Sequence, residues 1–329
     1  MKKLQILIPQ YNETDDILKP LLDSIEVQQN IDLNDIGVII VNDGTDIHLS
    51  ENFINGYTYD IDYYLNDHKG VSATRNACLD YATAEYVMFC DADDMFYNVC
   101  GLYVVFREIE NGGFESLVSA FVEETRDSDM KPAYITHDID FVFVHGKIYN
   151  RKFLLDNNIR WNDSLTVHED SYFNGLCQCL AEELKYFQVP FYLWKWRDAS
   201  VCRHDPKYIL KTYNNMLDSN DALVDQLLSR NRIEDAQFYA VNMIYDAYFT
   251  MNKDEWLNQE NKNYRYDTEY RFKDYWLKYK NLHDSIDTSI KNQIIMGIKN
   301  RMYGEGMILE SLTFGEWIRQ VESMIIQNT

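Results

Sequence analysis

Fully apolar runs that are followed at once by polar residues constrain the fold of this chain most strongly. Residues 37–41 read GVIIV and lead into Asn-Asp-Gly, and residues 86–90 read YVMFC and lead into Asp-Ala-Asp-Asp. Strands without polar alternation are buried on both faces, as in parallel sheets that are covered by helices. Similar patterns predict strands at 4–8 and 61–65 and helices at 14–29 and 71–83. We therefore expect an α/β fold with a Rossmann-like, mostly parallel sheet and helices on both faces.

The pattern of the chain changes after Pro206. Before this point, strand-like runs and helical spacing alternate, with further strands expected at 115–122 and 139–145 and helices at 151–160 and 171–186. After it, no proline occurs, and apolar residues recur at helical spacing over 207–230, 234–252, 270–282 and 286–302. We therefore predict an α/β domain at 1–206 and a mainly α-helical domain at 207–329.

The charge of the chain is strongly acidic and unevenly distributed. Residues 1–206 carry 16 Lys and Arg against 35 Asp and Glu, whereas residues 207–329 carry 15 against 18. The first part should repel polyanions such as DNA at long range, and the balanced second part could meet an anionic partner locally. The apolar run at 6–8 is too short for a signal peptide or a membrane span, so we expect a cytoplasmic protein without a transmembrane segment.

Polar clusters follow three of the expected strands, at 11–13, 42–46 and 91–94. Parallel α/β sheets bind ligands at the carboxyl ends of their strands, so these clusters are expected to meet in one crevice. The third cluster places Asp91, Asp93 and Asp94 close together, although like charges repel. An acidic turn would explain a lone D-x-D, but carboxylates in a crevice also predict a divalent cation held by hard oxygen ligands.

Five segments, in this order, resemble the family 2 glycosyltransferases of GT-A fold. They are ILIPQYNE at 6–13, VIIVNDGTDI at 38–47, HKGVSATRNACLDYATAEYVMFCDADD at 68–94, HGKIYNRKFLLDNNIRWNDSLTVHEDSYF at 145–173 and YLWKWRDASVC at 192–202. Asn42 stands where this family often has Asp. The resemblance covers about the first 200 residues and implies an inverting transferase with a GT-A catalytic domain.

The resemblance also implies a nucleotide-sugar donor, most often a UDP-sugar. Tyr11 would offer its ring to the base, and Asp43 would accept from the base N3–H. Arg75 would contact the donor or hold the D-x-D carboxylates, and Asp91 would bind the ribose or a metal-bound water. The donor-binding residues implied by the resemblance are Pro9, Tyr11, Glu13, Asp43, Arg75, Asp91 and Ala92.

The same resemblance implies a metal and a general base. Asp93 would bind Mn²⁺ or Mg²⁺ directly, and the further metal-site candidates are Asp91 and His204. Asp170 would take the proton of the acceptor hydroxyl, with Glu169 positioning the acceptor or the base. We expect Asp170 to stay ionised at neutral pH, because it precedes a predicted helix. The remaining expectations are that Asp94 supports its neighbours or faces the donor sugar, and that Arg197 and Ser200 are candidates for phosphate contact.

The acceptor is expected to be a glycan or a glycoconjugate. Two alternatives stay open: sugar transfer to hydroxymethylated bases of phage DNA, and a nucleotide-sugar-binding protein without transfer activity. Basic and aromatic residues interleave at 261–281, which would suit a polyanion surface, but the pattern favours a helix with a buried aromatic face.

Overall fold

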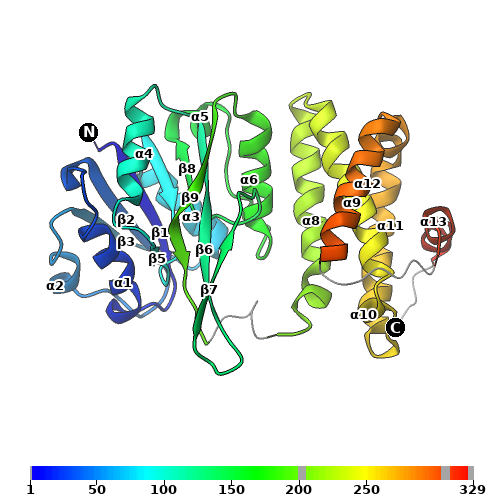
Figure 1. Ribbon diagram of the computed structural model, residues 1–329, viewed down its shortest axis with the longest axis horizontal. Helices are drawn as coiled ribbons and strands as arrows, with labels where there is room; N and C mark the ends of the chain where they lie inside the picture. Colours follow the sequence, from blue (N-terminus) through cyan, green and yellow to red (C-terminus); the bar gives the residue numbers. More distant parts are fainter. Residues whose placement is uncertain (1, 199–204, 305–311, 325–329) are drawn as a thin grey trace. The chain divides into compact units, whose positions relative to one another are not determined.

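The computed structural model describes residues 2–198, 205–304 and 312–324 (Figure 1). The chain divides into two compact units, residues 1–200 and 201–329, which are described separately below. Within the described residues, no helix has both the length and the apolar character that crossing a membrane requires.

The first unit is built on one mixed sheet. Its parallel part has the order β3-β2-β1-β4, and antiparallel pairing of β4 with β8 connects it to the rest, in the order β8-β6-β9-β5 with β7 paired to β6. The strands are β1 (Leu4–Gln10), β2 (Ile36–Asp43), β3 (Asp60–Asn66), β4 (Tyr86–Phe89), β5 (Met95–Phe96), β6 (Ser116–Arg126), β7 (Pro132–His137), β8 (Lys147–Asn150) and β9 (Leu184–Trp194).

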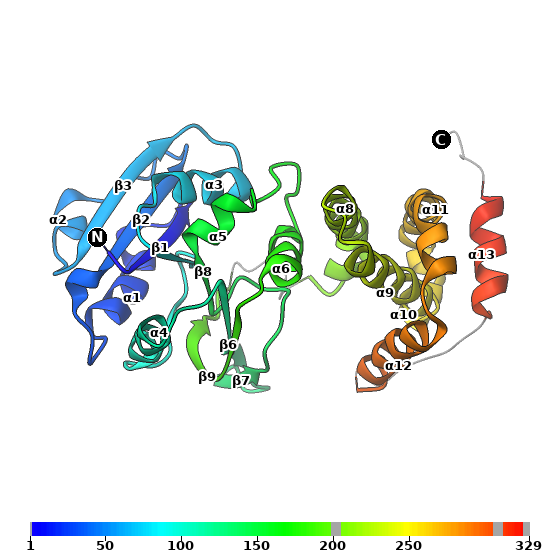
Figure 2. The same ribbon diagram turned by 90° about the horizontal axis from the view of Figure 1, so that it is seen from above.

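Helices cover both faces of this sheet, which confirms the expected α/β arrangement. Figure 2 shows α1 (Asp15–Glu26) and α4 (Gly101–Glu110) on one side, and α3 (Val71–Tyr81), α5 (Arg151–Asp156) and α6 (Glu169–Leu180) on the other. Every residue of β2 is buried, as its unbroken apolar sequence predicts. The short elements of this unit are η1 (Leu33–Asp35) and α2 (Glu51–Ile54).

Several expected elements differ from the structure; among them, the helix expected at 151–160 ends at Asp156. Residues 139–145 form no strand, because Asp140 Oδ1 accepts from the N–H groups of Val142 and Phe143 and so turns the chain. The expected helix at 171–186 ends at Leu180, and β9 begins four residues later, where it pairs in parallel with β6. Pairing between segments this far apart in the sequence overrides the local helical spacing.

The described residues of the second unit form helices, as expected. Their bounds are α8 (Tyr208–Ser229), α9 (Ile233–Met251), α10 (Asp254–Leu257), η2 (Gln259–Asn261), α11 (Lys262–Ser285), α12 (Thr288–Gly304) and α13 (Phe314–Ser323). Large aromatic side chains fill the core of this unit; among them, Trp256 is 1% exposed and Trp317 is 0% exposed.

The interleaved basic and aromatic stretch lies in α11, and its rings form a buried face. Phe272, Tyr275 and Tyr279 are buried. Two of its cations are paired with acids of α8: Arg271 pairs with Asp218 and Asp221, and Lys278 pairs with Asp221 and Asp225. The structure therefore favours the interpretation of this stretch as a packed helix over that of a polyanion surface.

Candidate active site

The carboxyl ends of β1, β2 and β4 meet at one pocket of about 280 Å³. The sequence predicted this convergence from the polar residues that follow each strand. Of the predicted donor and metal residues, the structure places seven on the pocket wall: Pro9, Tyr11, Glu13, Asp43, Asp91, Ala92 and Asp93. Gln10, His68, Gly70, Val71 and Thr74 complete the wall.

Asp43, at the end of β2, anchors the loop that enters α3. Its buried carboxylate accepts from Lys69 N at 2.8 Å and from Gly70 N at 3.0 Å, and it lies 2.9 Å from His68 Nδ1. The ring of His68 in turn stacks on Tyr11, with 4.9 Å between ring centroids. Asp43 thus has a structural partner for each oxygen, and His68 is a pocket residue that the sequence analysis did not single out.

Arg75, on α3, joins a carboxylate of the pocket wall to two carboxylates of α6. Its Nη1 donates to Glu169 Oε1 at 2.9 Å and to Asp170 Oδ1 at 3.0 Å, while its Nη2 donates to Asp91 Oδ1 at 3.0 Å. The guanidinium is buried and lies 4.4 Å from the ring centroid of Trp161. Of the two roles expected for Arg75, the structure shows the one that holds carboxylates.

Asp170 lies in the first turn of α6, and its Oδ2 accepts from Val144 N at 2.9 Å. Burial raises the pKa of Asp170 to about 7, against the lowering effect of Arg75. Glu169 and Asp91 raise this pKa further, because they place negative charge nearby. The expectation that Asp170 stays ionised at neutral pH is therefore corrected: burial outweighs the lowering effects of Arg75 and the Val144 N–H, and the pKa lies at about 7.

Asp93 faces a cation that comes from the segment after β9. Arg197 Nη1 donates to Asp93 Oδ2 at 3.0 Å and to Glu13 Oε1 at 3.3 Å. The other oxygen of Glu13 accepts from Tyr11 N at 2.6 Å. Burial raises the pKa of Glu13, while the Tyr11 N–H and Arg197 lower it. Two carboxylates from different strand ends therefore converge on one positively charged nitrogen.

Asp94 points away from this pair, into the interior. Its Oδ2 accepts from the Tyr192 hydroxyl at 2.5 Å and lies 3.8 Å from His145 Nδ1, and its Oδ1 accepts from Lys195 N at 2.9 Å. Burial, followed by the charges of Asp91 and Asp93, raises the pKa of Asp94 well above its usual range. This fits the expectation that Asp94 supports its neighbours.

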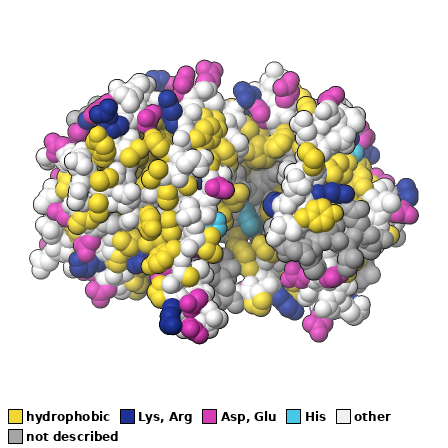
Figure 3. Space-filling model, in the orientation of Figure 1, with side chains coloured by type: hydrophobic (Ala, Val, Ile, Leu, Met, Phe, Trp, Pro, Cys, Tyr) yellow, Lys and Arg dark blue, Asp and Glu magenta, His cyan; other side chains and the backbone are white. Residues whose placement is uncertain are grey.

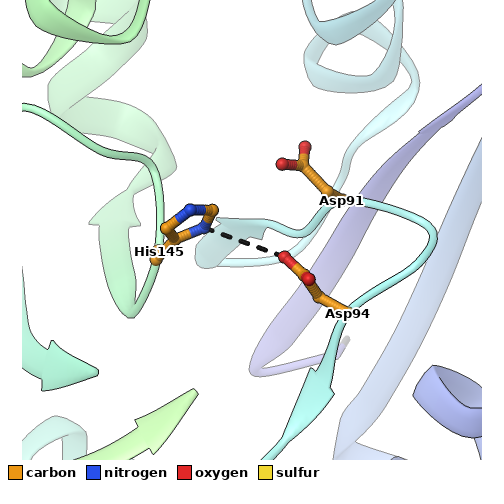
Figure 4. Close-up of side chains that lie close together, drawn as sticks. All are labelled: Asp91, Asp94 and His145. Carbon is orange, nitrogen blue, oxygen red and sulfur yellow. Dashed lines mark ion pairs between the residues drawn. The ribbon is translucent and has the colours of Figure 1, made fainter. Parts of the chain in front are cut away.

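One group of side chains could hold a metal ion within the described part of the chain. One ligand atom from each of Asp91, Asp94 and His145 lies within 4.8 Å of the others. Figure 4 shows Asp94 directed at the imidazole of His145, with Asp91 beside the pair. The sequence analysis did not single out His145, although it opens the HGKIY segment. The predicted site residues His204 and Ser200 lie outside the described residues.

The family follows from comparison with known proteins. The model of the family described as "Glycosyl transferase family 2" matches residues 5–170, half of the chain. This chain belongs to the family 2 glycosyltransferases, as the sequence motifs predicted.

Similar proteins carry glycosyltransferase names. Glycosyltransferase GlyA of Streptococcus pneumoniae is 26% identical over 226 residues, which are 61% of this chain but only 32% of GlyA. The chain thus spans about a third of the length of this relative. Putative glycosyltransferase EpsH of Bacillus subtilis is 23% identical over 257 residues, 70% of this chain and 71% of EpsH.

Solved structures confirm the GT-A fold. A structure of S. aureus TarS residues 1–349 has a TM-score of 0.61 at 15% identity, and the match covers 93% of this chain and 92% of that one. A structure of the same TarS fragment in complex with UDP matches equally well. The fragment has also been solved with UDP-GlcNAc, with a TM-score of 0.51.

Proposed function

We propose that this protein transfers a sugar from a UDP-sugar to an acceptor hydroxyl with inversion of configuration. The observation that carries the proposal is the set of contacts around Arg75. One buried guanidinium joins Asp91, on the donor pocket, to Glu169 and Asp170. A single side chain would then fix the position of the donor-binding carboxylate relative to the two carboxylates on the acceptor side. Holding reacting groups in a defined geometry raises the reaction rate.

Asp170 is the proposed general base. A base works best when its pKa lies near the working pH, and burial brings the pKa of Asp170 to about 7. The contacts from Arg75 and Val144 N fix both of its oxygens. Asp170 would take the proton of the attacking hydroxyl on the face of the sugar opposite the diphosphate, so the product would have the inverted configuration. A protein that only bound the donor would have no use for such a group.

The nucleotide is proposed to lie in the pocket beside Tyr11 and Asp43. Support comes from Tyr11, which is 50% exposed and whose ring stacks on His68, and from the predicted residues that share the pocket wall. UDP is the proposed nucleotide, because TarS, which shares the fold, has been solved with UDP and with UDP-GlcNAc. UDP-GlcNAc is therefore the first donor to test. The proposed acceptor is the hydroxyl of a glycan or glycoconjugate.

A divalent cation, Mn²⁺ or Mg²⁺, fits the residues present. Glu13 and Asp93 already converge on the guanidinium of Arg197, which stands in for a cation there. Hard carboxylate oxygens are the donors these metals prefer, and the bound metal would neutralise the charge of the leaving diphosphate. Asp93 is the proposed ligand. Asp94 is the weaker candidate, because both of its oxygens accept from protein donors and its pKa is raised.

Turnover of UDP-sugars tests this function. With UDP-GlcNAc and Mn²⁺ we expect slow release of UDP, faster with a suitable acceptor, and none in EDTA. Asp93→Asn should cripple turnover. His145→Phe, which keeps a ring among its aromatic neighbours, should retain most of it. Full activity in EDTA would exclude the metal, and a severe loss in His145→Phe alone would move the metal to Asp91, Asp94 and His145.

A further inference from the structure

Arg197 bonds to two carboxylates of the donor pocket, those of Glu13 and Asp93, although its own side chain does not line the pocket. It follows β9 in the chain, and Glu13 follows β1, 184 residues earlier. The side chain of Arg197 is 39% exposed, whereas those of Glu13 and Asp93 are 13% and 26% exposed. The cation thus reaches in from the rim to acids that lie deeper.

The backbone before Arg197 is fixed from two directions. Lys195 N donates to buried Asp94 at 2.9 Å, and Trp196 N donates to Glu124 Oε2 at 3.3 Å. Asp94 is the neighbour of Asp93, so the same loop holds both the main chain and the side chain of this segment. The placement of Arg197 against Asp93 is therefore specified by the fold.

The pocket needs a positive charge at this point. Its wall carries the carboxylates of Glu13, Asp43, Asp91 and Asp93, and no Lys or Arg from the described chain lies on it. Asp43 is satisfied by the 68–70 loop and Asp91 by Arg75. Glu13 and Asp93 are left to share Arg197, because two carboxylates this close repel each other unless a cation lies between them.

We propose that Arg197 holds the place of the divalent cation on Asp93 and Glu13, and that the metal binds by displacing it. This rests on the proposed function, in which Asp93 is a metal ligand. A metal bound to Asp93 Oδ2 would stand at about 2.0–2.2 Å from this oxygen. The guanidinium nitrogen is at 3.0 Å from the same oxygen, so both cations cannot keep these positions without strong repulsion.

The exchange gives Arg197 a defined effect on the enzyme. Without a metal, the positive charge of Arg197 reduces the repulsion between the carboxylates of Glu13 and Asp93, and so preserves the shape of the pocket. It also lowers the affinity for a free cation, since a metal that arrives alone must break two ion pairs. When the metal binds together with a diphosphate, the released guanidinium of Arg197 can pair with the diphosphate. Arg197 therefore favours binding of the metal and the nucleotide together over binding of the metal alone.

Binding of Mn²⁺ alone, followed by the EPR signal of the free ion and without nucleotide, tests the exchange. Arg197→Gln should bind Mn²⁺ about three- to tenfold more tightly than the native protein, the range expected when two partly exposed ion pairs no longer compete. Arg197→Lys, which keeps the charge, should stay near the native affinity. Asp93→Asn in the Arg197→Gln background should abolish the gain.

A matched control removes the same charge elsewhere in the first unit. Arg160 pairs with Asp80 at the surface and touches none of the pocket acids. Arg160→Gln should leave the affinity for Mn²⁺ unchanged. Tighter Mn²⁺ binding by Arg160→Gln would mean that net charge causes the effect, and would overturn the proposal. Unchanged or weaker Mn²⁺ binding in Arg197→Gln would also overturn it.

A separate measurement tests the proposed function: the rise in melting temperature that UDP causes in the presence of Mn²⁺. If UDP stabilises the native protein but Arg197→Gln gains no affinity for Mn²⁺, the exchange is wrong and the proposed function stands. If Arg197→Gln gains affinity but UDP has no effect, the exchange stands and the nucleotide assignment fails.

Discussion

At Asp170, burial and a guanidinium act in opposite directions on one carboxyl group. Burial is the larger effect and brings the pKa of Asp170 to about 7, although Arg75 lies 3.0 Å from Oδ1. Arg75 divides its two terminal nitrogens among Asp91, Glu169 and Asp170, so no single carboxylate receives its full charge. Burial therefore sets the pKa of Asp170 near neutrality, and the negative charges of Glu169 and Asp91 raise it further against the lowering effect of Arg75.

The pH dependence of turnover follows from this pKa. A protonated Asp170 cannot accept a proton, so the rate should rise with pH and level off above about 7. Below that value it should fall about tenfold per pH unit, the behaviour of a single essential base. The measurement is kcat against pH with saturating donor and acceptor. A rate that stays level down to pH 5 would contradict the assignment of Asp170.

Residues of the site were predictable from the sequence where they lie at or just beyond the end of a strand. Tyr11 follows β1, Asp43 ends β2 and Asp93 lies in the loop after β4, and the structure places all three on one pocket. His68 and His145 were missed, because their places depend on partners far along the chain: His68 on Tyr11, and His145 on Tyr192 and Trp194. The pKa of Asp170 was misjudged for the same reason, since burial is a property of the folded chain.

At the level of elements, the end of β2 and the loop before α3 are packed backbone to backbone. Gly44 has a positive φ of 70°, and a Cβ placed on it would lie 2.3 Å from His68 N. No side chain fits there without moving the loop whose N–H groups bind Asp43. The glycine after Asp43 is thus required both by its backbone conformation and by this close contact.

Gly44→Ala should therefore destabilise the protein and weaken UDP binding. Gly112→Ala is the matched control, because Gly112 also has a positive φ, of 115°, but no atom lies within 4 Å of an added Cβ. The control should lose about 1–2 kcal/mol from backbone strain alone. Gly44→Ala should lose a further 1–3 kcal/mol or so from overpacking. Urea unfolding measures both, and equal losses would refute the close contact.

The elements themselves were predictable where the apolar runs are unbroken, as in β1, β2 and β4. β7 and most of β9 were not expected, and residues 139–145 form no strand. β9 is only partly buried over most of its length, and its first residues were read as the end of a helix. Its place in the sheet comes from parallel pairing with β6, some 68 residues earlier, and from antiparallel pairing with β5. The spacing of apolar residues within one segment does not reveal pairing with a distant strand.

For the whole molecule, the charge distribution disfavours binding to polyanions such as duplex DNA. The net charge is −22, and two basic residues of the most basic-looking stretch, Arg271 and Lys278 in α11, are paired with acids of α8. On the face drawn in Figure 3, Lys and Arg side chains of the described residues are scattered among Asp and Glu and form no continuous patch. Nothing here favours a duplex DNA acceptor, since phosphate contacts supply most of such affinity.

Duplex DNA should therefore bind poorly. In a fluorescence anisotropy titration at physiological salt, we expect a Kd weaker than the roughly 10⁻⁴–10⁻⁶ M of non-specific DNA-binding proteins. Adding hydroxymethylated bases to the duplex should change nothing. Micromolar binding that weakens steeply with salt would reverse this conclusion and revive DNA as the acceptor.

The central claim, that Asp170 is the base of an inverting transfer, is tested most directly by the kinetics of Asp170→Asn. This change keeps the size of the side chain but removes proton acceptance. UDP-sugar affinity should stay near native, while kcat falls by about two to four orders of magnitude. Glu169→Gln, which also removes a carboxylate from Arg75, should lose far less of kcat.

NMR of the product of the native enzyme should show the anomeric configuration opposite to that of the donor. Near-native kcat in Asp170→Asn, or retention of configuration, would contradict the account.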